Sequence, residues 1–107
     1  MEPIDHPAMR NLEPGETVHV VAVATDASVL VTDRRVAVAS GDRLALDIPY
    51  DRLRRVQFDL GRGRPATLVL VPEHPADEPQ VLAIPVEAYR EAATAITVIG
   101  SRLYDLP

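Results

Sequence analysis

The sequence predicts a mainly β domain that ends in one α-helix. Seven short runs rich in valine, leucine and isoleucine alternate with turn residues, which is the pattern of antiparallel strands. From residue 86 onward the apolar residues recur at spacings of three and four, which is a helical period. A length of 107 residues fits one domain. We therefore expect an N-terminal tail over 1–16 and a single folded domain over 17–104.

The N-terminal tail contains three prolines, and a short helix is predicted at Pro7–Leu12. Proline suits the first turn of a helix, and either Asp5 or His6 precedes it as a candidate cap.

The first four strands are predicted over residues 17–24, 29–32, 36–39 and 44–48. The first of them carries apolar side chains on both faces, which is typical of a strand covered at least partly on each side. Turn residues separate the strands at Thr25–Ser28, Asp33–Arg35 and Ser40–Asp42. Pro49 ends the fourth strand, because proline has no N–H for the ladder.

Three further strands are predicted over 56–60, 67–71 and 80–84, and a helix over 86–104. A glycine turn (61–65) and an acidic loop (73–79) separate these strands. Gly100 lies inside the helix, where glycine costs about 1 kcal/mol relative to alanine, so we expect a close backbone approach there. The predicted buried stripe of the helix consists of Val86, Tyr89, Ala93, Ile96, Gly100 and Leu103.

This order of elements resembles the PH-like superfamily, in particular the small bacterial PH-like (pleckstrin-homology-like) and GRAM-like domains. Besides the terminal helix, three segments carry the resemblance: Leu12–Glu16 before the first strand, Val31–Arg35 at the second turn, and Ile48–Tyr50 after the fourth strand. The resemblance implies a barrel of seven antiparallel strands in two near-orthogonal sheets, with one end capped by the helix. Packing sheets at such an angle needs a sharp corner, and Pro49–Tyr50 supplies one.

Enzymatic chemistry is not indicated by the sequence. There is no cysteine, and His6, His19 and His74 show no ligand spacing for a metal. No serine lies in a nucleophile elbow. The adjacent carboxylates Asp77 and Glu78 lie in a proline-rich loop, so we expect them to be solvated surface charges. We predict no catalytic residue, no cofactor and no metal ligand.

Charge is distributed unevenly along a chain of net charge −5. Residues 34–64 hold eight arginines against four acidic residues, and both flanking segments are acidic. Every basic residue is arginine and alanine is abundant, which is typical of a bacterial gene of high GC content. The candidate interaction surface comprises Arg34, Arg35, Arg52, Arg54, Arg55, Arg62 and Arg64.

The resemblance places the ligand mouth of the family among the loops at Thr25–Ser28, Ser40–Arg43 and Glu73–Pro79. These loops are acidic here, so a phosphoinositide headgroup is disfavoured, and the arginines should lie apart from this acidic rim. Nucleic acid is also disfavoured, because few aromatic residues accompany the arginines and the chain as a whole is acidic.

The expected function is a non-catalytic PH-like interaction or assembly module that mediates protein–protein contacts or homo-oligomerisation. Opposite charges on two faces of one molecule favour such head-to-tail contact. The alternative is a peripheral membrane adaptor that binds anionic lipid through the arginine-rich face. A cytoplasmic location is expected, because no apolar run approaches the roughly 20 residues of a membrane span and the N-terminus lacks the pattern of a secretory signal.

Overall fold

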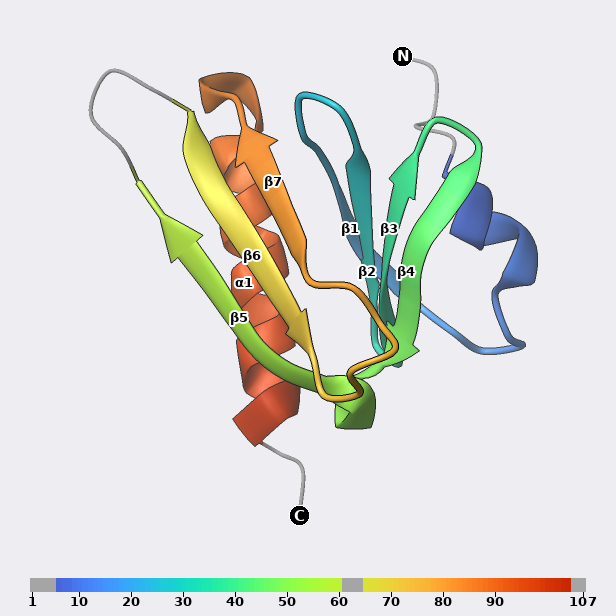
Figure 1. The fold of residues 1–107 in the computed structure, drawn as a ribbon. Coiled ribbons are helices and arrows are strands. Elements are labelled where there is room, and N and C mark those ends of the chain that lie inside the picture. The colour runs from blue at the N-terminus through green and yellow to red at the C-terminus, as the bar shows by residue number, and fades with distance from the viewer. Residues whose placement is uncertain (1–5, 61–64, 105–107) are drawn as a thin grey trace.

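The computed structural model describes residues 6–60 and 65–104 and contains two antiparallel sheets and one long helix (Figure 1). Three short 3₁₀ helices, η1 (Pro7–Asn11), η2 (Tyr50–Arg52) and η3 (Val86–Ala88), and the α-helix α1 (Tyr89–Tyr104) complete it. The strands are β1 (Val18–Val23), β2 (Ser28–Thr32), β3 (Arg35–Ser40), β4 (Arg43–Pro49), β5 (Leu53–Asp59), β6 (Ala66–Pro72) and β7 (Gln80–Ile84).

Hydrogen bonding arranges the strands in sequence order as β1-β2-β3-β4 and β5-β6-β7. The seven predicted strands and the terminal helix are thereby confirmed. The two sheets do not close into a barrel: η2 carries the chain from β4 to β5 without a shared ladder. At the β1–β2 turn the sheets are linked by a backbone hydrogen bond, in which Thr25 N–H donates to the carbonyl oxygen of Ala83 at 2.9 Å.

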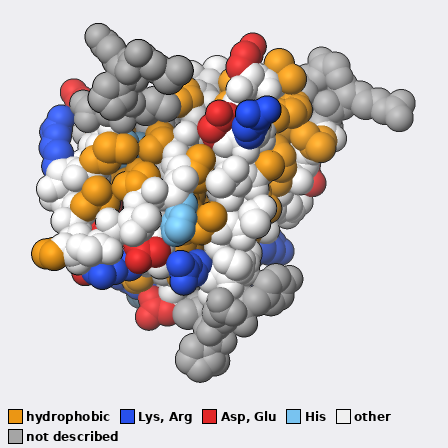
Figure 2. All heavy atoms as spheres, turned by 180° about the vertical axis from the view of Figure 1, so that it is seen from behind, with side chains coloured by type: hydrophobic (Ala, Val, Ile, Leu, Met, Phe, Trp, Pro, Cys, Tyr) orange, Lys and Arg blue, Asp and Glu red, His pale blue; other side chains and the backbone are white. Residues whose placement is uncertain are grey.

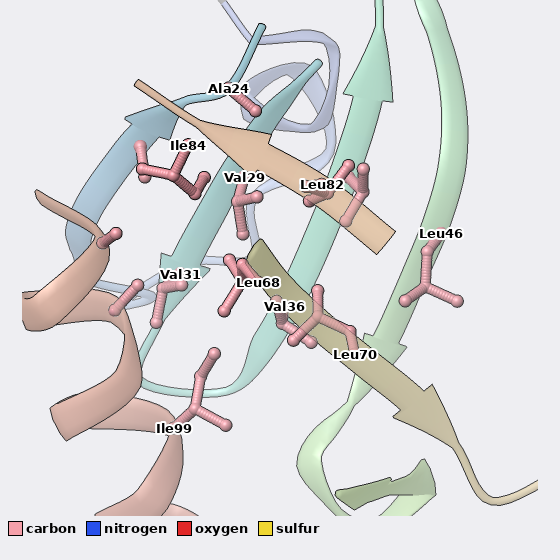
Figure 3. Packing of buried hydrophobic residues seen from close by; sticks show 14 of the residues in the cluster. Ala24, Val29, Val31, Val36, Leu46, Leu68, Leu70, Leu82, Ile84 and Ile99 are labelled. Atoms are coloured by element: carbon pink, nitrogen blue, oxygen red, sulfur yellow. The ribbon is translucent and has the colours of Figure 1, made fainter. Parts of the chain in front are cut away.

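The core lies between the two sheets, and their strands cross over it (Figure 3). Alternation along the strands sends one side chain of each pair inward, as in β6, where Ala66, Leu68 and Leu70 are fully buried. They meet Val29, Val31 and Val36 from the other sheet and Ile99 from α1 (Figure 3). Burial of this apolar surface is the main term that holds the two sheets together.

Helix α1 packs against β1, β5 and η2 through a stripe of small residues. The buried positions are Ala92, Ala95 and Ile99 in α1, together with Ala88 at the end of η3. The predicted stripe is right in part: Tyr89, Ile96 and Leu103 are half-buried against the core. It is wrong at Val86, which is 68% exposed, and at Ala93, which faces solvent. Small alanines let the helix approach β1 closely, whereas the prediction favoured larger apolar residues. The close approach expected at Gly100 is also wrong, because a Cβ there would meet nothing within 4 Å.

The N-terminal segment covers the outer face of the four-stranded sheet. It forms the 3₁₀ helix η1 rather than an α-helix, and His6 is the cap, its Nδ1 accepting the N–H of Ala8 at 3.1 Å. Ala8 is buried with Leu30 and Ala37 in a second apolar cluster. This packing confirms that the first sheet is covered on both faces and explains the apolar residues on both sides of β1.

Candidate functional site

The predicted arginine surface is not one continuous set of free side chains, and Arg35 is the clearest departure. Its guanidinium holds the carboxylate of Glu16 from two sides, with Nε–Oε2 at 2.9 Å and Nη2–Oε1 at 2.7 Å. Nη2 also donates to the backbone carbonyl of Asn11, and Nη1 lies 3.4 Å from Asp47. The Arg35 side chain is only 15% exposed and that of Glu16 is fully buried. Arg35 is therefore a structural residue and does not belong to the free part of the predicted arginine surface.

The same pair organises the start of β1 and the β2–β3 turn. The Thr32 hydroxyl donates to Glu16 Oε2 at 2.6 Å and accepts the backbone N–H groups of Arg34 and Arg35. Hydrogen bonds from Arg35 and Thr32 hold the pKa of Glu16 at about 2, against an ordinary value of 4.5. The Tyr50 hydroxyl donates to the Thr32 carbonyl at 2.6 Å, and burial raises the pKa of this tyrosine. Residues from the segments Leu12–Glu16, Val31–Arg35 and Ile48–Tyr50 thus meet in one network.

Two further arginines are paired at the surface. Arg34 donates to Glu13 at 2.9 Å, with both side chains well exposed. Arg52 lies 3.6 Å from Asp77, and its carbonyl accepts the N–H of Glu73. Figure 1 shows the β6–β7 connection beside η2, far from the β1–β2 and β3–β4 turns. The expected separation of the basic run from the acidic loops is therefore wrong at Arg52.

Arg54 and Arg55 remain as an exposed basic pair on β5, one of the two edge strands of the three-stranded sheet. Leu53 pairs with Pro72 and Arg55 with Val71, so Arg54 is the extra residue of a β-bulge. A bulge sets two residues against one on the neighbouring strand, and here both consecutive side chains reach solvent. Within residues 6–60 and 65–104, neither arginine forms an ion pair or a side-chain hydrogen bond. Arg62 and Arg64 lie outside the described residues.

A hollow that the sequence did not indicate lies where β1 passes the beginning of α1. It has a volume of about 340 Å³ and is open to solvent. Figure 2 shows this side of the molecule, where hydrophobic side chains reach the surface between charged groups. The hollow is lined by Val21, Val23, Pro85, Glu87, Ala88 and Glu91. The sequence offered one signal for this hollow, the pair Glu87 and Glu91 four residues apart near the start of the predicted helix. It did not show that a strand edge lies beside them.

The histidines serve separate local roles. The ring of His6 is fully buried between Ala8 N–H and the carbonyl of Ser28, at 3.1 and 3.2 Å. His74 Nδ1 accepts the N–H of Ala76 in the β6–β7 connection, and His19 is exposed on β1. Among the residues that the structure describes, no three histidine or carboxylate side chains gather as they would around a metal ion.

Comparison with known proteins adds no relative: no protein-family model, no curated protein and no solved structure matches the chain. Within the described part of the chain, no helix combines the length and the apolarity needed to cross a membrane.

Proposed function

We propose that this chain is a non-catalytic PH-like interaction or assembly module that contacts an acidic surface through Arg54 and Arg55. The order of four strands, three strands and a closing helix supports the PH-like assignment. The observation that carries the function is the unpaired state of these two arginines within the described residues. Arg34, Arg35 and Arg52 are each paired with a carboxylate, whereas the β5 bulge turns Arg54 and Arg55 outward.

An acidic protein surface is the natural partner for such a pair. Two adjacent guanidinium groups can each form charge-assisted hydrogen bonds with carboxylates. The chain itself has a net charge of −5 and offers acidic surface of its own. Self-association in a head-to-tail manner would therefore satisfy the arginines without another partner, and such contacts close into rings when the geometry allows it.

The first test is the absolute mass in solution, measured by size exclusion with light scattering at low and high salt. The double variant Arg54→Glu with Arg55→Glu is compared with the control Arg10→Glu with Arg43→Glu, which changes the charge equally at exposed arginines elsewhere. Assembly through this pair is supported if the oligomer dissociates in high salt and also in the Arg54→Glu, Arg55→Glu variant, but not in the control variant. An oligomer of unchanged mass in both variants removes the pair from the interface.

The alternative function is a peripheral membrane adaptor, favoured by the same exposed arginine pair. Anionic lipid attracts each surface arginine with a free energy of roughly 1 kcal/mol. Co-sedimentation with phosphatidylserine-containing vesicles distinguishes the two functions. Salt-sensitive binding that the Arg54→Glu, Arg55→Glu variant abolishes, together with a monomeric mass, would replace the assembly function by the membrane function.

A further inference from the structure

Among the described strands, none but β2 hydrogen-bonds to β1, and β7 reaches its outer edge just beyond the strand, where Thr25 N–H donates to Ala83 O. At the turn, Ala24 N–H donates to Ala27 O. Hydrogen-bonded and open pairs alternate along an antiparallel ladder. The N–H and C=O groups of Val21 and Val23 therefore point away from β2. In the described part of the chain, no hydrogen bond outside the β1–β2 ladder involves either residue.

The apolar hollow described above lies along this edge. Val21 and Val23 form its floor on the strand side, and Pro85 and Ala88 form its helix side. Ala88 is buried at the base of the hollow, and Val23 is still 45% exposed. A volume of about 340 Å³ lies at the lower end of the range of ligand pockets, roughly 300–1,000 Å³. This size suits one or two aliphatic side chains.

Two carboxylates define the charge of the hollow. Glu87 and Glu91 lie one helical turn apart on its rim, and neither forms an ion pair within the described residues. Oε2 of Glu91 is buried and has no hydrogen-bond donor there. A buried polar atom without a partner is costly, and an outside donor can reach it only when the Glu91 side chain turns toward the hollow. The neighbouring Arg90 lines a different, shallow hollow with Ala93 and Thr97.

We propose that this groove binds an extended, basic segment of a partner protein. The segment runs along β1 and hydrogen-bonds to the outward backbone groups of Val21 and Val23, as in other cases of strand addition. One or two aliphatic side chains of the segment occupy the hollow, and an arginine or lysine beside them pairs with Glu87 and Glu91. This surface is separate from the Arg54–Arg55 pair on β5 and does not depend on its function.

The probe is a phage-displayed library of random linear peptides, selected on the full chain. We expect enriched peptides that combine an arginine or lysine with a neighbouring valine, isoleucine or leucine. One such peptide, labelled with fluorescein, is then titrated by anisotropy. The variant Glu87→Gln with Glu91→Gln should weaken its binding about tenfold or more, because charge-assisted hydrogen bonds are lost.

The control variant is Glu73→Gln with Glu78→Gln, which neutralises two exposed glutamates in the β6–β7 connection. It should leave the affinity unchanged within about twofold, since distant exposed charges are screened. Selection without enrichment, enriched peptides without a basic residue, or equal weakening in both variants would overturn the proposal. A concentration-dependent mass that falls only in the Glu87→Gln, Glu91→Gln variant would also overturn it, by showing that a second copy of this chain occupies the groove.

Discussion

The guanidinium of Arg35 and the carboxylate of Glu16 form a bidentate ion pair that ties the segment before β1 to the start of β3. The pair is nearly closed to solvent, and the hydrogen bonds that the described residues make to the carboxylate come from Arg35, Thr32 and the N–H of Glu13. Paired charges of this kind contribute little beyond a hydrophobic replacement, but removal of one partner leaves the other charge buried. The stability of the fold should therefore depend strongly on both members.

Replacing Arg35 with methionine should lower the free energy of unfolding by about 3–5 kcal/mol, because the Glu16 carboxylate loses its counter-charge. Arg34→Met is the matched control, since the exposed Arg34–Glu13 pair is worth at most about 1 kcal/mol. Urea unfolding of both variants measures the difference. Equal stability of the two variants would contradict a structural role for Arg35.

Acid should destabilise the fold through Glu16. Its pKa in the folded chain is about 2, below the ordinary value of 4.5, so its contribution is complete above about pH 4.5 and is lost as the pH falls toward 2. At about 1.4 kcal/mol per pKa unit, the loss is on the order of 3 kcal/mol. The thermal midpoint, measured between neutral pH and pH 2, should fall less steeply in Glu16→Gln. An identical slope would assign the acid sensitivity to other groups.

The inner face of α1 should be most sensitive at Ile99. This side chain is fully buried, so Ile99→Ala should cost about 2–5 kcal/mol. Ile96 is only partly buried beside the core, and Ile96→Ala should cost about 1–2 kcal/mol. Thermal or urea unfolding distinguishes them, and a larger loss for Ile96→Ala would restore the helical phase that was predicted from the sequence.

Two glycines should respond in opposite directions to alanine. Gly100→Ala should stabilise the chain by about 0.5–1 kcal/mol, because a Cβ finds open space there and glycine is a poor helix former. Gly41 also has open space, but its φ of +62° disfavours alanine, so Gly41→Ala should destabilise by about 1–2 kcal/mol. Differential scanning calorimetry of both variants gives the sign. A destabilised Gly100→Ala would contradict the open space found around this position.

The sequence predicts well what local patterns determine. Alternation of apolar residues located all seven strands within a few residues, and the change of period located the helix. The buried face of α1 was predicted only in part: Tyr89, Ile96 and Leu103 do pack on the core, but Ala92 and Ala95 were not included. These alanines are buried because α1 packs against β1, which composition does not encode. Tertiary context of this kind overrides local preference.

The candidate site was predicted less well than the fold. Whether an arginine is free depends on carboxylates far away in sequence, as with Glu16 for Arg35 and Asp77 for Arg52. The run of basic residues therefore identified the charged segment, but it did not show which of its arginines are free of ion pairs. The groove between β1 and α1 depends on the docking of the helix beside an edge strand, and no local pattern reports such a placement.

The order of the strands has a consequence for the folding pathway. Each hydrogen-bonded ladder joins strands that are consecutive in the chain, so each sheet closes only short loops, and short loops lose little entropy on closure. Contacts between the sheets, such as Thr25 with Ala83, join distant parts of the chain and close much longer loops. We expect the two meanders to form quickly and separately, and their docking with α1 to be the slow step that sets the folding rate.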